Sequence, residues 1–282
     1  MCNQYALITG ASEGLGKFLA IECAKRKLNL ILVALPGSGL NYVQNYIIKA
    51  FHVNVLCIEK DLTEEQNCYQ LYQQVKEQGI SISVLINNAG IGGTFSFDEK
   101  DAKFYSKIIS INVTTPTILC RLFLPDLKKN APSFIMNVSS LAGIFHLPNK
   151  QVYGATKSYL LGFSKSLSKE LHGENVFVSA LCPGGMNTNW RLTMENRMMG
   201  TWISRQSVME PSEVAAIGIR KMFEKKSMIV TGFWNRCFLF WDQIFPKKLK
   251  DGLMNYQMAK WKRKGVAMKT PVLQPQFITI KK

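Results

Sequence analysis

Short runs of apolar residues recur along the chain, and each is followed by a turn and then by a segment with helical periodicity. The first run, Tyr5–Thr9, ends at Gly10, which is typical of a buried strand. The same pattern predicts strands at 29–34, 54–58, 84–87, 133–138 and 176–181, and helices at 17–27, 41–51 and 64–78. Continuously apolar strands that alternate with helices predict an α/β fold with a doubly wound parallel sheet, covered on both faces, in a single domain over residues 1–282.

The composition is typical of a folded protein with reduced thiols. Of the 282 residues, 47% are hydrophobic and 19% are charged, which allows a sizeable core. The seven cysteines are scattered, without a Cys-x-x-Cys or a His/Cys cluster, so we expect free thiols and no metal site. No signal peptide is evident, and no uninterrupted apolar stretch reaches the roughly 20 residues of a spanning helix. We therefore expect a cytoplasmic protein, with peripheral membrane contact left open.

The positive charge is concentrated near the C-terminus. The whole chain has a formal net charge of +16 at pH 7. From Arg220 onward, 15 lysines and arginines stand against three acidic residues, so this part contributes +12. The basic character therefore belongs to the C-terminal part and not to the body of the protein.

Tyr153 and Lys157 are four residues apart, a spacing that places two side chains on one face of a helix, about 5–6 Å apart at Cβ. A nearby ammonium favours the phenolate, so we expect Lys157 to lower the pKa of Tyr153 from its ordinary value of roughly 10. A tyrosine tuned in this way can exchange a proton with a substrate oxygen. Taken alone, a pair at this spacing is more often an accidental pair on a solvated helix.

Gly10, Gly14 and Gly16 follow the first predicted strand and open the first predicted helix. In that position, glycines allow a tight turn and let main-chain N–H groups approach a pyrophosphate. The spacing G-x-x-x-G-x-G differs from the G-x-G-x-x-G pattern, and Phe18 after Gly16-Lys17 excludes a P-loop. Taken alone, this cluster could also be a plain turn.

The glycine motif, written out as Thr9-Gly10-x-x-x-Gly14-x-Gly16, resembles the cofactor motif of the short-chain dehydrogenase/reductase family. Further motifs of that family follow in the family's order: Asp61-Leu62, Asn87-Asn88-Ala89-Gly90, Asn112, Ser140 thirteen residues before Tyr153, and Pro183-Gly184 with Thr188. The resemblance covers about residues 4–190. It implies a Rossmann-type fold that binds a nicotinamide cofactor.

The resemblance also implies the parts of the cofactor that these motifs contact. The aspartate–leucine pair would contact the adenine, the asparagine motif would stabilise the central sheet, and the proline–glycine segment would flank the nicotinamide. The cofactor contacts implied are Thr9, Gly10, Ser12, Gly14, Leu15, Gly16, Asp61, Leu62, Asn88, Ala89, Gly90, Tyr153, Lys157, Pro183, Gly184 and Thr188.

By the same resemblance, four residues are catalytic. Tyr153 would be the general acid/base, and Lys157 would lower its pKa and bind the nicotinamide ribose. Ser140 would donate a hydrogen bond to the reacting oxygen, and Asn112 would hold a water that links Lys157 to solvent. Two alternatives stay open: Ser140 as a capping hydroxyl and Asn112 as a local turn-former. Ser139 is a rival for the serine role, but it stands fourteen residues before Tyr153.

The choice between NADP and NAD depends on the end of the second strand. NAD-specific relatives place an acidic residue there, whereas this chain reads Val33-Ala34-Leu35-Pro36, which favours NADP. The arginine of many NADP-dependent relatives is also missing, and Glu13 occupies a position that is basic in some of them. We therefore hypothesise that the turn at Ser38 cradles the 2′-phosphate through main-chain N–H groups and its hydroxyl. The alternative is a flexible turn, and NAD is not excluded.

The segment near 188–212 is rich in methionine and tryptophan, and the resemblance implies a mobile lid over the substrate pocket. Methionines and aromatic residues suit an apolar, adaptable pocket, so a hydrophobic carbonyl or alcohol such as a steroid, an acyl chain or a retinoid is expected. Ordinary core packing is the alternative. Glu210-Pro211 resembles the start of the helix after the lid.

The C-terminal extension near 233–282 mixes aromatic residues with cations. Such a segment can lie at a membrane surface, form a subunit interface, extend the pocket, or be a solvated tail. Nucleic-acid binding is not expected, because no recognised motif accompanies the charge.

Together these features predict an oxidoreductase that transfers a hydride between a nicotinamide cofactor and the carbonyl or alcohol of a small hydrophobic molecule. The alternative is a catalytically idle NAD(P)-binding sensor or scaffold. The resemblance also implies a homodimer or homotetramer, assembled through the helices that contain Asn112 and Tyr153.

Overall fold

The computed structural model describes residues 4–145, 147–187, 207–244 and 252. The chain divides into two compact units, residues 1–236 and 237–282. The first unit contains the sheet and the site residues discussed below. Of the second, the structure describes only residues 237–244 and Gly252. A single domain over the whole chain stays a prediction.

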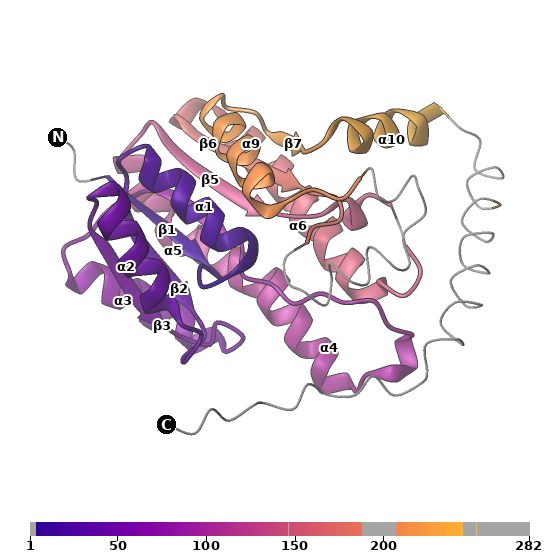
Figure 1. Cartoon of the computed structure of the whole chain (residues 1–282), viewed down its shortest axis with the longest axis horizontal. Helices are drawn as coiled ribbons and strands as arrows, with labels where there is room; N and C mark the ends of the chain where they lie inside the picture. Colours follow the sequence, from indigo (N-terminus) through magenta and orange to yellow (C-terminus); the bar gives the residue numbers. More distant parts are fainter. Residues whose placement is uncertain (1–3, 146, 188–206, 245–251, 253–282) are drawn as a thin grey trace, which may run out of the picture. The chain divides into compact units, whose positions relative to one another are not determined.

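The first unit is built on one parallel sheet of seven strands (Figure 1). The strands are β1 (Tyr5–Thr9), β2 (Asn29–Ala34), β3 (Val55–Glu59), β4 (Ile82–Asn87), β5 (Ser133–Val138), β6 (Val176–Cys182) and β7 (Met228–Val230). Their order is β3-β2-β1-β4-β5-β6-β7. The order reverses between β1 and β4, which is the point where doubly wound sheets bind their ligands.

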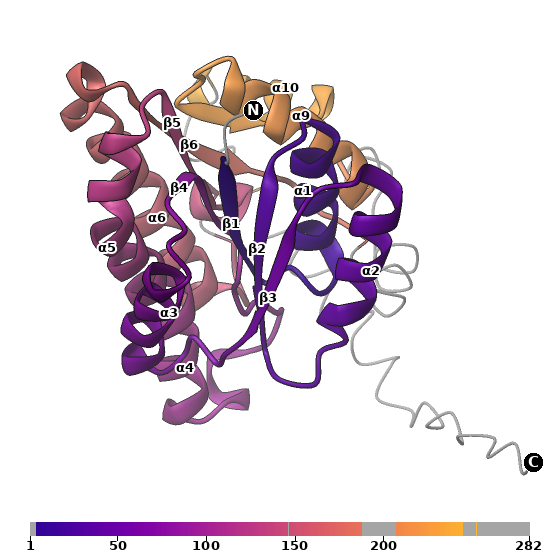
Figure 2. The same cartoon turned by 90° about the vertical axis from the view of Figure 1, so that its left-hand side faces the viewer.

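Helices cover both faces of this sheet. Figure 2 shows α1, α2 and α9 on one side, and α3, α4, α5 and α6 on the other. The helices are α1 (Gly14–Lys25), α2 (Leu40–Phe51), α3 (Glu65–Glu77), α4 (Ala102–Ile109), α5 (Thr115–Lys129), α6 (Gln151–Glu170), α9 (Pro211–Phe223) and α10 (Phe233–Ile244). A π-helical turn, Ser110–Thr114, joins α4 to α5.

The core forms two layers because neighbouring residues of a strand point to opposite faces. Ala6 and Ile8 of β1 pack in the layer that includes residues of α1, α2 and α9. Leu7, between them, packs in the other layer with Leu71 of α3 and Phe123 of α5. Strands buried on both faces explain the continuously apolar runs, and the predicted doubly wound α/β fold is confirmed.

One helical run in the described part of the chain, residues 102–129, has the length and apolar composition of a spanning helix. Length and composition are the only basis for that statement, and a buried core helix meets the same test. In this fold, Leu119, Phe123 and Leu127 of the run are buried in the core layer. Core packing therefore accounts for their apolar character.

Candidate active site

The sequence motifs converge at the carboxyl edge of the sheet. Gly10 follows β1, Asp61 comes after β3, Asn88 follows β4, Ser140 comes after β5 and Pro183 follows β6. Because parallel strands end at a common edge, these residues line that edge on both sides of the switch point between β1 and β4.

The glycine loop is pressed against the end of β4. A Cβ atom at Gly16 would lie 2.0 Å from the main-chain oxygen of Gly10 and 2.5 Å from Nδ2 of Asn88, so only glycine fits there. Gly10 itself has a φ of +65°, which favours glycine. The first turn of α1 begins at Gly14, with no acidic residue in it. The N-terminal N–H groups of α1 therefore form an anion-binding end at this edge.

The other predicted residues of this loop occupy different environments. Leu15 is buried, Ser12 and Gly14 are half-buried, and Glu13 is exposed. Glu13 precedes the helix, but its side chain makes no capping hydrogen bond. Its carboxylate therefore leaves the first N–H groups of α1 uncapped.

Thr9 and Asn88 join the ends of β1 and β4. The Thr9 hydroxyl accepts hydrogen bonds from the main-chain N–H groups of Asn88 and Ala89, both at 3.0 Å. The Asn88 side chain donates to the main-chain oxygens of Thr9 at 2.9 Å and Gly10 at 3.1 Å. These bonds hold the glycine loop in place. They also join two neighbouring strands of the sheet, which is the stabilising role that the resemblance implied for Asn88 and Ala89.

Asp61 and Leu62 form a closed turn after β3. The Asp61 carboxylate accepts from the main-chain N–H of Thr63 at 2.9 Å and from its hydroxyl at 2.8 Å. Leu62 is buried, and its main-chain oxygen accepts from the Thr115 hydroxyl at 2.6 Å. The bonds explain the shape of the turn, while the expected adenine contact stays a prediction.

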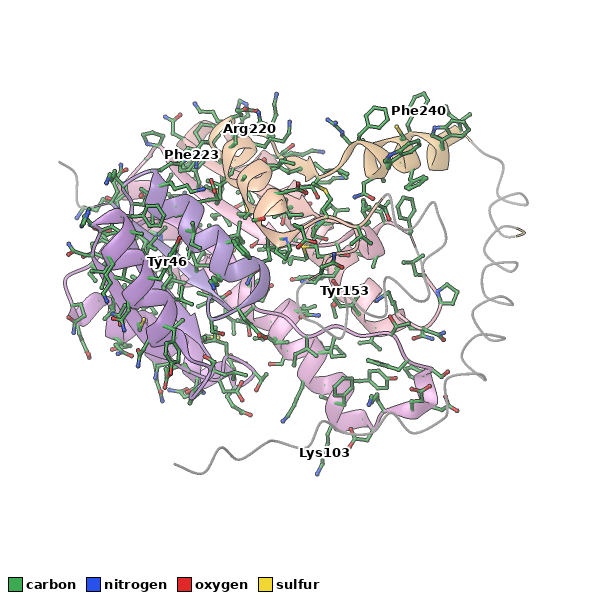
Figure 3. All side chains as sticks on the ribbon, viewed as in Figure 1. Tyr46, Lys103, Tyr153, Arg220, Phe223 and Phe240 are labelled. Carbon is green, nitrogen blue, oxygen red and sulfur yellow. The ribbon has the colours of Figure 1, made fainter. Side chains whose placement is uncertain are left out.

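Tyr153 and Lys157 lie one turn apart in α6, as predicted, and Tyr153 is labelled in Figure 3. The Lys157 ammonium lies 5.8 Å from the centroid of the Tyr153 ring and donates to the main-chain oxygen of Val138 at 2.7 Å. Ser140, just beyond β5, lies close enough to the Tyr153 side chain to lower its pKa. The Ser140 hydroxyl also accepts from the main-chain N–H of Ala142 at 3.1 Å. The structure thus brings the predicted serine, tyrosine and lysine together.

The rival serine is directed elsewhere. The Ser139 hydroxyl is buried and donates to the main-chain oxygen of Lys157 at 2.7 Å. Ser139 therefore joins the end of β5 to α6, and Ser140 is the serine that reaches Tyr153.

The pKa of Tyr153 is shifted in the direction opposite to our expectation. Burial raises the pKa of Tyr153, and the nearby Ser140 side chain lowers it only in part. Burial also lowers the pKa of the Lys157 ammonium, to about 8. The expected lowering of the Tyr153 pKa is therefore wrong for the groups of this chain. The four-residue spacing indicates the attraction of the ammonium, but it contains no information on the cost of taking a phenolate out of water.

Asn112 lies in the π-helical turn, and its side chain is fully engaged. Its Oδ1 accepts from the main-chain N–H of Ile91 at 3.0 Å, and its Nδ2 donates to the main-chain oxygen of Ile91 at 2.9 Å and to the Thr156 hydroxyl at 3.0 Å. The asparagine therefore ties the loop after β4 to α6. The water expected at Asn112 stays a prediction.

Three glycines after β4 lie close to the site. A Cβ atom at Gly90 would lie 2.8 Å from Oδ1 of Asn112, and one at Gly92 would lie 3.0 Å from the Tyr153 ring. The Lys150 ammonium lies 5.6 Å from that ring and donates to the main-chain oxygen of Gly93 at 3.3 Å. No sequence motif indicated Gly92 or Lys150. The position of Lys150, three residues before Tyr153, was the available signal.

The segment after β6 is held by a residue that no motif indicated. The main-chain oxygen of Pro183 accepts from the main-chain N–H of Leu141 at 2.9 Å. A Cβ atom at Gly184 would lie 2.6 Å from Nδ2 of Asn235. The buried Asn235 side chain donates to the main-chain oxygens of Ser207 at 3.2 Å and Thr231 at 2.8 Å, and its Oδ1 has no hydrogen-bond partner in the described structure.

Most of the expected lid, and Thr188 with it, lies outside the described residues. The two ends of that segment do meet, because Met186 and Met209 form a β-bridge and the Met209 N–H donates to the main-chain oxygen of Gly185 at 3.0 Å. Pro211 is the first residue of α9, as the sequence predicted. The lid itself stays a prediction.

The turn at Ser38 agrees with only part of the hypothesis that its main-chain N–H groups and hydroxyl bind a 2′-phosphate. Gly37 and Gly39 have φ values of +71° and +75°, so the turn depends on both glycines. The Ser38 N–H donates to the main-chain oxygen of Leu35 at 3.2 Å, so this N–H is used inside the turn. The Ser38 hydroxyl and the N-terminal N–H groups of α2 remain as candidates for binding a phosphate.

Among the described residues, no group of three or more His, Cys, Asp or Glu is placed to hold a metal ion. The six described cysteines are free thiols, and four of them are buried.

A model of the short chain dehydrogenase family matches residues 4–198. The chain belongs to the short-chain dehydrogenase/reductase family. The match begins one residue before β1 and runs beyond Pro183-Gly184, so it includes every motif described above.

Similar proteins are known within this family. The chain is 30% identical to the mouse very-long-chain 3-oxoacyl-CoA reductase over 64% of this chain and 59% of the mouse protein, and so spans less than two thirds of that relative. It is 29% identical to the human 17-beta-hydroxysteroid dehydrogenase type 3 over 66% of this chain and 60% of the human protein. A short-chain dehydrogenase from Sphingobium yanoikuyae, solved with NADPH, shares the fold with a TM-score of 0.72, 23% identity, and coverage of 96% of this chain and 98% of the other.

Proposed function

We propose that this short-chain dehydrogenase/reductase is an NAD(P)-dependent oxidoreductase that interconverts a carbonyl compound and an alcohol. The observation that supports this most is the grouping of Ser140, Tyr153 and Lys157 at the carboxyl edge of the sheet, beside the glycine loop. A phenol, a hydroxyl and an ammonium in one place provide a proton donor, a hydrogen-bond donor and a positive charge for a reacting oxygen.

The carboxyl edge fits a nicotinamide dinucleotide. Gly16 leaves no room for a side chain, and the uncapped N-terminus of α1 offers N–H groups to a pyrophosphate. By the family resemblance, Lys157 would bind the nicotinamide ribose, and Pro183-Gly184 would flank the nicotinamide. The cofactor would supply or accept the hydride, and the residues of the chain would orient it and move the proton.

The raised pKa of Tyr153 suits the direction of reduction. Tyr153 is half-buried, and a phenol whose pKa is raised stays protonated at neutral pH and can donate its proton to a carbonyl oxygen. Ser140 would donate a second hydrogen bond to the same oxygen. The Lys157 ammonium would stabilise the phenolate that remains after the transfer.

We propose a hydrophobic substrate and a preference for NADP. The names of the mouse and human relatives point to a ketone on an acyl chain or a steroid. No acidic residue stands at the end of β2 to bind a ribose hydroxyl and repel a 2′-phosphate. A homodimer or homotetramer through the helices that contain Asn112 and Tyr153 belongs to the same proposal.

The test is the turnover of purified wild-type protein and its Tyr153→Phe variant. NADPH consumption would be followed with a long-chain 3-oxoacyl thioester, a steroid ketone and a small water-soluble ketone. The variant should lose at least roughly 100-fold in kcat, the lower range of general acid–base catalysis, and still bind NADPH. Near-full turnover by the variant would overturn the proposed mechanism. Cofactor binding without wild-type turnover on any carbonyl would favour the idle sensor.

A further inference from the structure

Helix α10 presents an exposed apolar stripe. Phe233, Phe240 and Ile244 expose 64%, 62% and 62% of their surface. At 3.6 residues per turn, these three positions fall on one side of the helix, together with Cys237. Trp234 and Trp241 lie along one flank of the stripe and expose 40% and 55%. Figure 3 labels Phe240 among the side chains of α10.

Exposed large hydrophobic residues are concentrated on α10. Of the 13 exposed large hydrophobic residues in the described structure, five lie on this one helix of 12 residues. Isolated exposed hydrophobic residues are ordinary on protein surfaces, whereas a contiguous patch indicates an interaction site.

The first turn of α10 fixes which side of the helix faces outward. Asn235 lies on the side of the helix opposite to Phe233 and Ile244 and is 1% exposed. Its side chain donates to the main-chain oxygens of Ser207 and Thr231. The apolar stripe therefore lies on the side that these hydrogen bonds leave free.

The charge of this part of the chain indicates what covers the stripe. Arg236 is exposed within the first turn of α10. From Arg220 to the C-terminus, the sequence contains 15 basic and three acidic residues, a net charge of +12. A second copy of the chain would bring two such segments together, and like charges repel. An anionic surface would instead attract the cations while the aromatic and aliphatic side chains insert.

We propose that α10 docks this protein on an anionic lipid bilayer, with the stripe in the interface between head groups and acyl chains. Tryptophan, phenylalanine and isoleucine on one face of a helix, with cations nearby, are the residues that bind such an interface. Binding strength there scales with the buried apolar area and with the attraction to anionic lipids.

The first turn of α10 starts at the carboxyl edge of the sheet, because a Cβ atom at Gly184 would lie 2.6 Å from Nδ2 of Asn235. The docking through the stripe does not depend on the proposed function.

The experiment is co-sedimentation of the full chain with vesicles of phosphatidylcholine alone or of phosphatidylcholine with phosphatidylglycerol. We expect binding to the anionic vesicles to exceed binding to the neutral ones by at least about tenfold and to fall with added salt. The variant Phe240→Ser with Ile244→Ser should lose at least about tenfold in partition. The matched control is Tyr46→Ser with Ile48→Ser on α2, an exposed aromatic and aliphatic pair that expose 52% and 40% and should leave partition unchanged.

Two further readouts separate the outcomes. Sedimentation velocity of the same variants would show whether the stripe joins two copies: a dimer that the α10 variant dissociates, without vesicle binding by the wild type, would overturn the proposal. Equal binding of the α10 variant and the wild type would overturn it as well. Turnover of a water-soluble ketone should be unchanged in the α10 variant, so a wild type that reduces this ketone but binds no vesicle would refute the docking and leave the proposed function intact.

Discussion

Lys157 donates its ammonium proton to the main-chain oxygen of Val138, at a distance of 2.7 Å. The bond joins α6 to the carboxyl end of β5, directly before the two serines of the site. Lys157 is buried, and this hydrogen bond compensates its ammonium for the loss of contact with water. The bond also holds the ammonium near the Tyr153 ring. The cation of the site is therefore held in place by the sheet and does not depend on the substrate for its position.

Reduction by this protein should slow as pH rises through about 8. The pKa of Lys157 lies near 8 because burial disfavours the ammonium, so the ion is lost at mildly alkaline pH. Loss of the charge would remove the group that we propose stabilises the Tyr153 phenolate. The measurement is kcat/KM for ketone reduction against pH. A profile that stays flat well above pH 8 would contradict the assignment of the charge to Lys157.

The titration of Lys157 should also affect stability, but the free energy of unfolding should rise with pH where the rate of reduction falls. Above pH 8 the folded protein loses the Lys157 proton, while the unfolded chain keeps it up to its ordinary pKa of 10.5. The unfolded state then binds more protons, so stability rises with pH in this window. The free energy of unfolding of the wild type, minus that of Lys157→Met, should increase by about 2 kcal/mol between pH 8 and pH 9.5. Urea denaturation of both proteins measures this difference, and subtraction removes the titration of the cysteines. A difference that falls or stays constant as pH rises would refute the low pKa of Lys157.

Alanine substitutions at the two adjacent serines should have different effects. Ser140→Ala removes the hydroxyl that reaches Tyr153, and kcat should fall by roughly 10²–10³, as for the loss of an oxyanion donor. Ser139→Ala leaves the buried main-chain oxygen of Lys157 without this donor, which should cost about 1–3 kcal/mol of stability and little kcat. Steady-state kinetics and urea denaturation of both variants provide the check. Equal losses of kcat would show that the two serines do not have separate roles.

Much of the fold could be predicted because the sheet is buried on both faces. The ranges predicted for β1, β2 and β5 coincide with the observed strands Tyr5–Thr9, Asn29–Ala34 and Ser133–Val138. Strand β7 was not predicted, because its three residues are too few to show a period. Helix α1 was predicted to start at Lys17 and not at Gly14, because glycine has a low helix propensity.

The site was predictable where side chains form motifs and not where distant segments meet. Ser140, Tyr153 and Lys157 were expected from the resemblance of their spacing to the family's motif, and the structure brings them together. Asn235 meets Gly184 across a large separation in sequence, and the acceptor for Lys157 is a main-chain oxygen, which has no sequence signature. The direction of the Tyr153 pKa depends on burial, which spacing does not contain.

Two glycine-to-alanine substitutions should change stability in opposite directions. In Gly16→Ala the new Cβ would lie 2.0 Å from the main-chain oxygen of Gly10, so the loop must move. We expect a loss of about 1–3 kcal/mol or more, with weaker NADPH binding. In Gly162→Ala, in the exposed middle of α6, the new Cβ meets nothing within 4 Å, and the gain should be roughly 0.5–1 kcal/mol. Urea denaturation and NADPH titration test both, and a tolerated Gly16→Ala would show that the loop is looser than its contacts indicate.

The proposed preference for NADPH should weaken when a carboxylate is placed at the end of β2. Ala34 is the last residue of that strand, and its main-chain oxygen accepts from the Lys60 N–H at 2.8 Å, so the position is well fixed. In Ala34→Asp the carboxylate would accept hydrogen bonds from the ribose hydroxyls and repel a 2′-phosphate. The ratio of kcat/KM for NADPH over NADH should therefore fall by at least about tenfold, equivalent to roughly 1.4 kcal/mol.

Ala34→Asn has the same shape without the charge and should keep most of the wild-type ratio, while Ser38→Ala tests the hydroxyl of the neighbouring turn by itself. A wild type that prefers NADH, or equal ratios in the aspartate and asparagine variants, would show that the end of β2 does not select the cofactor.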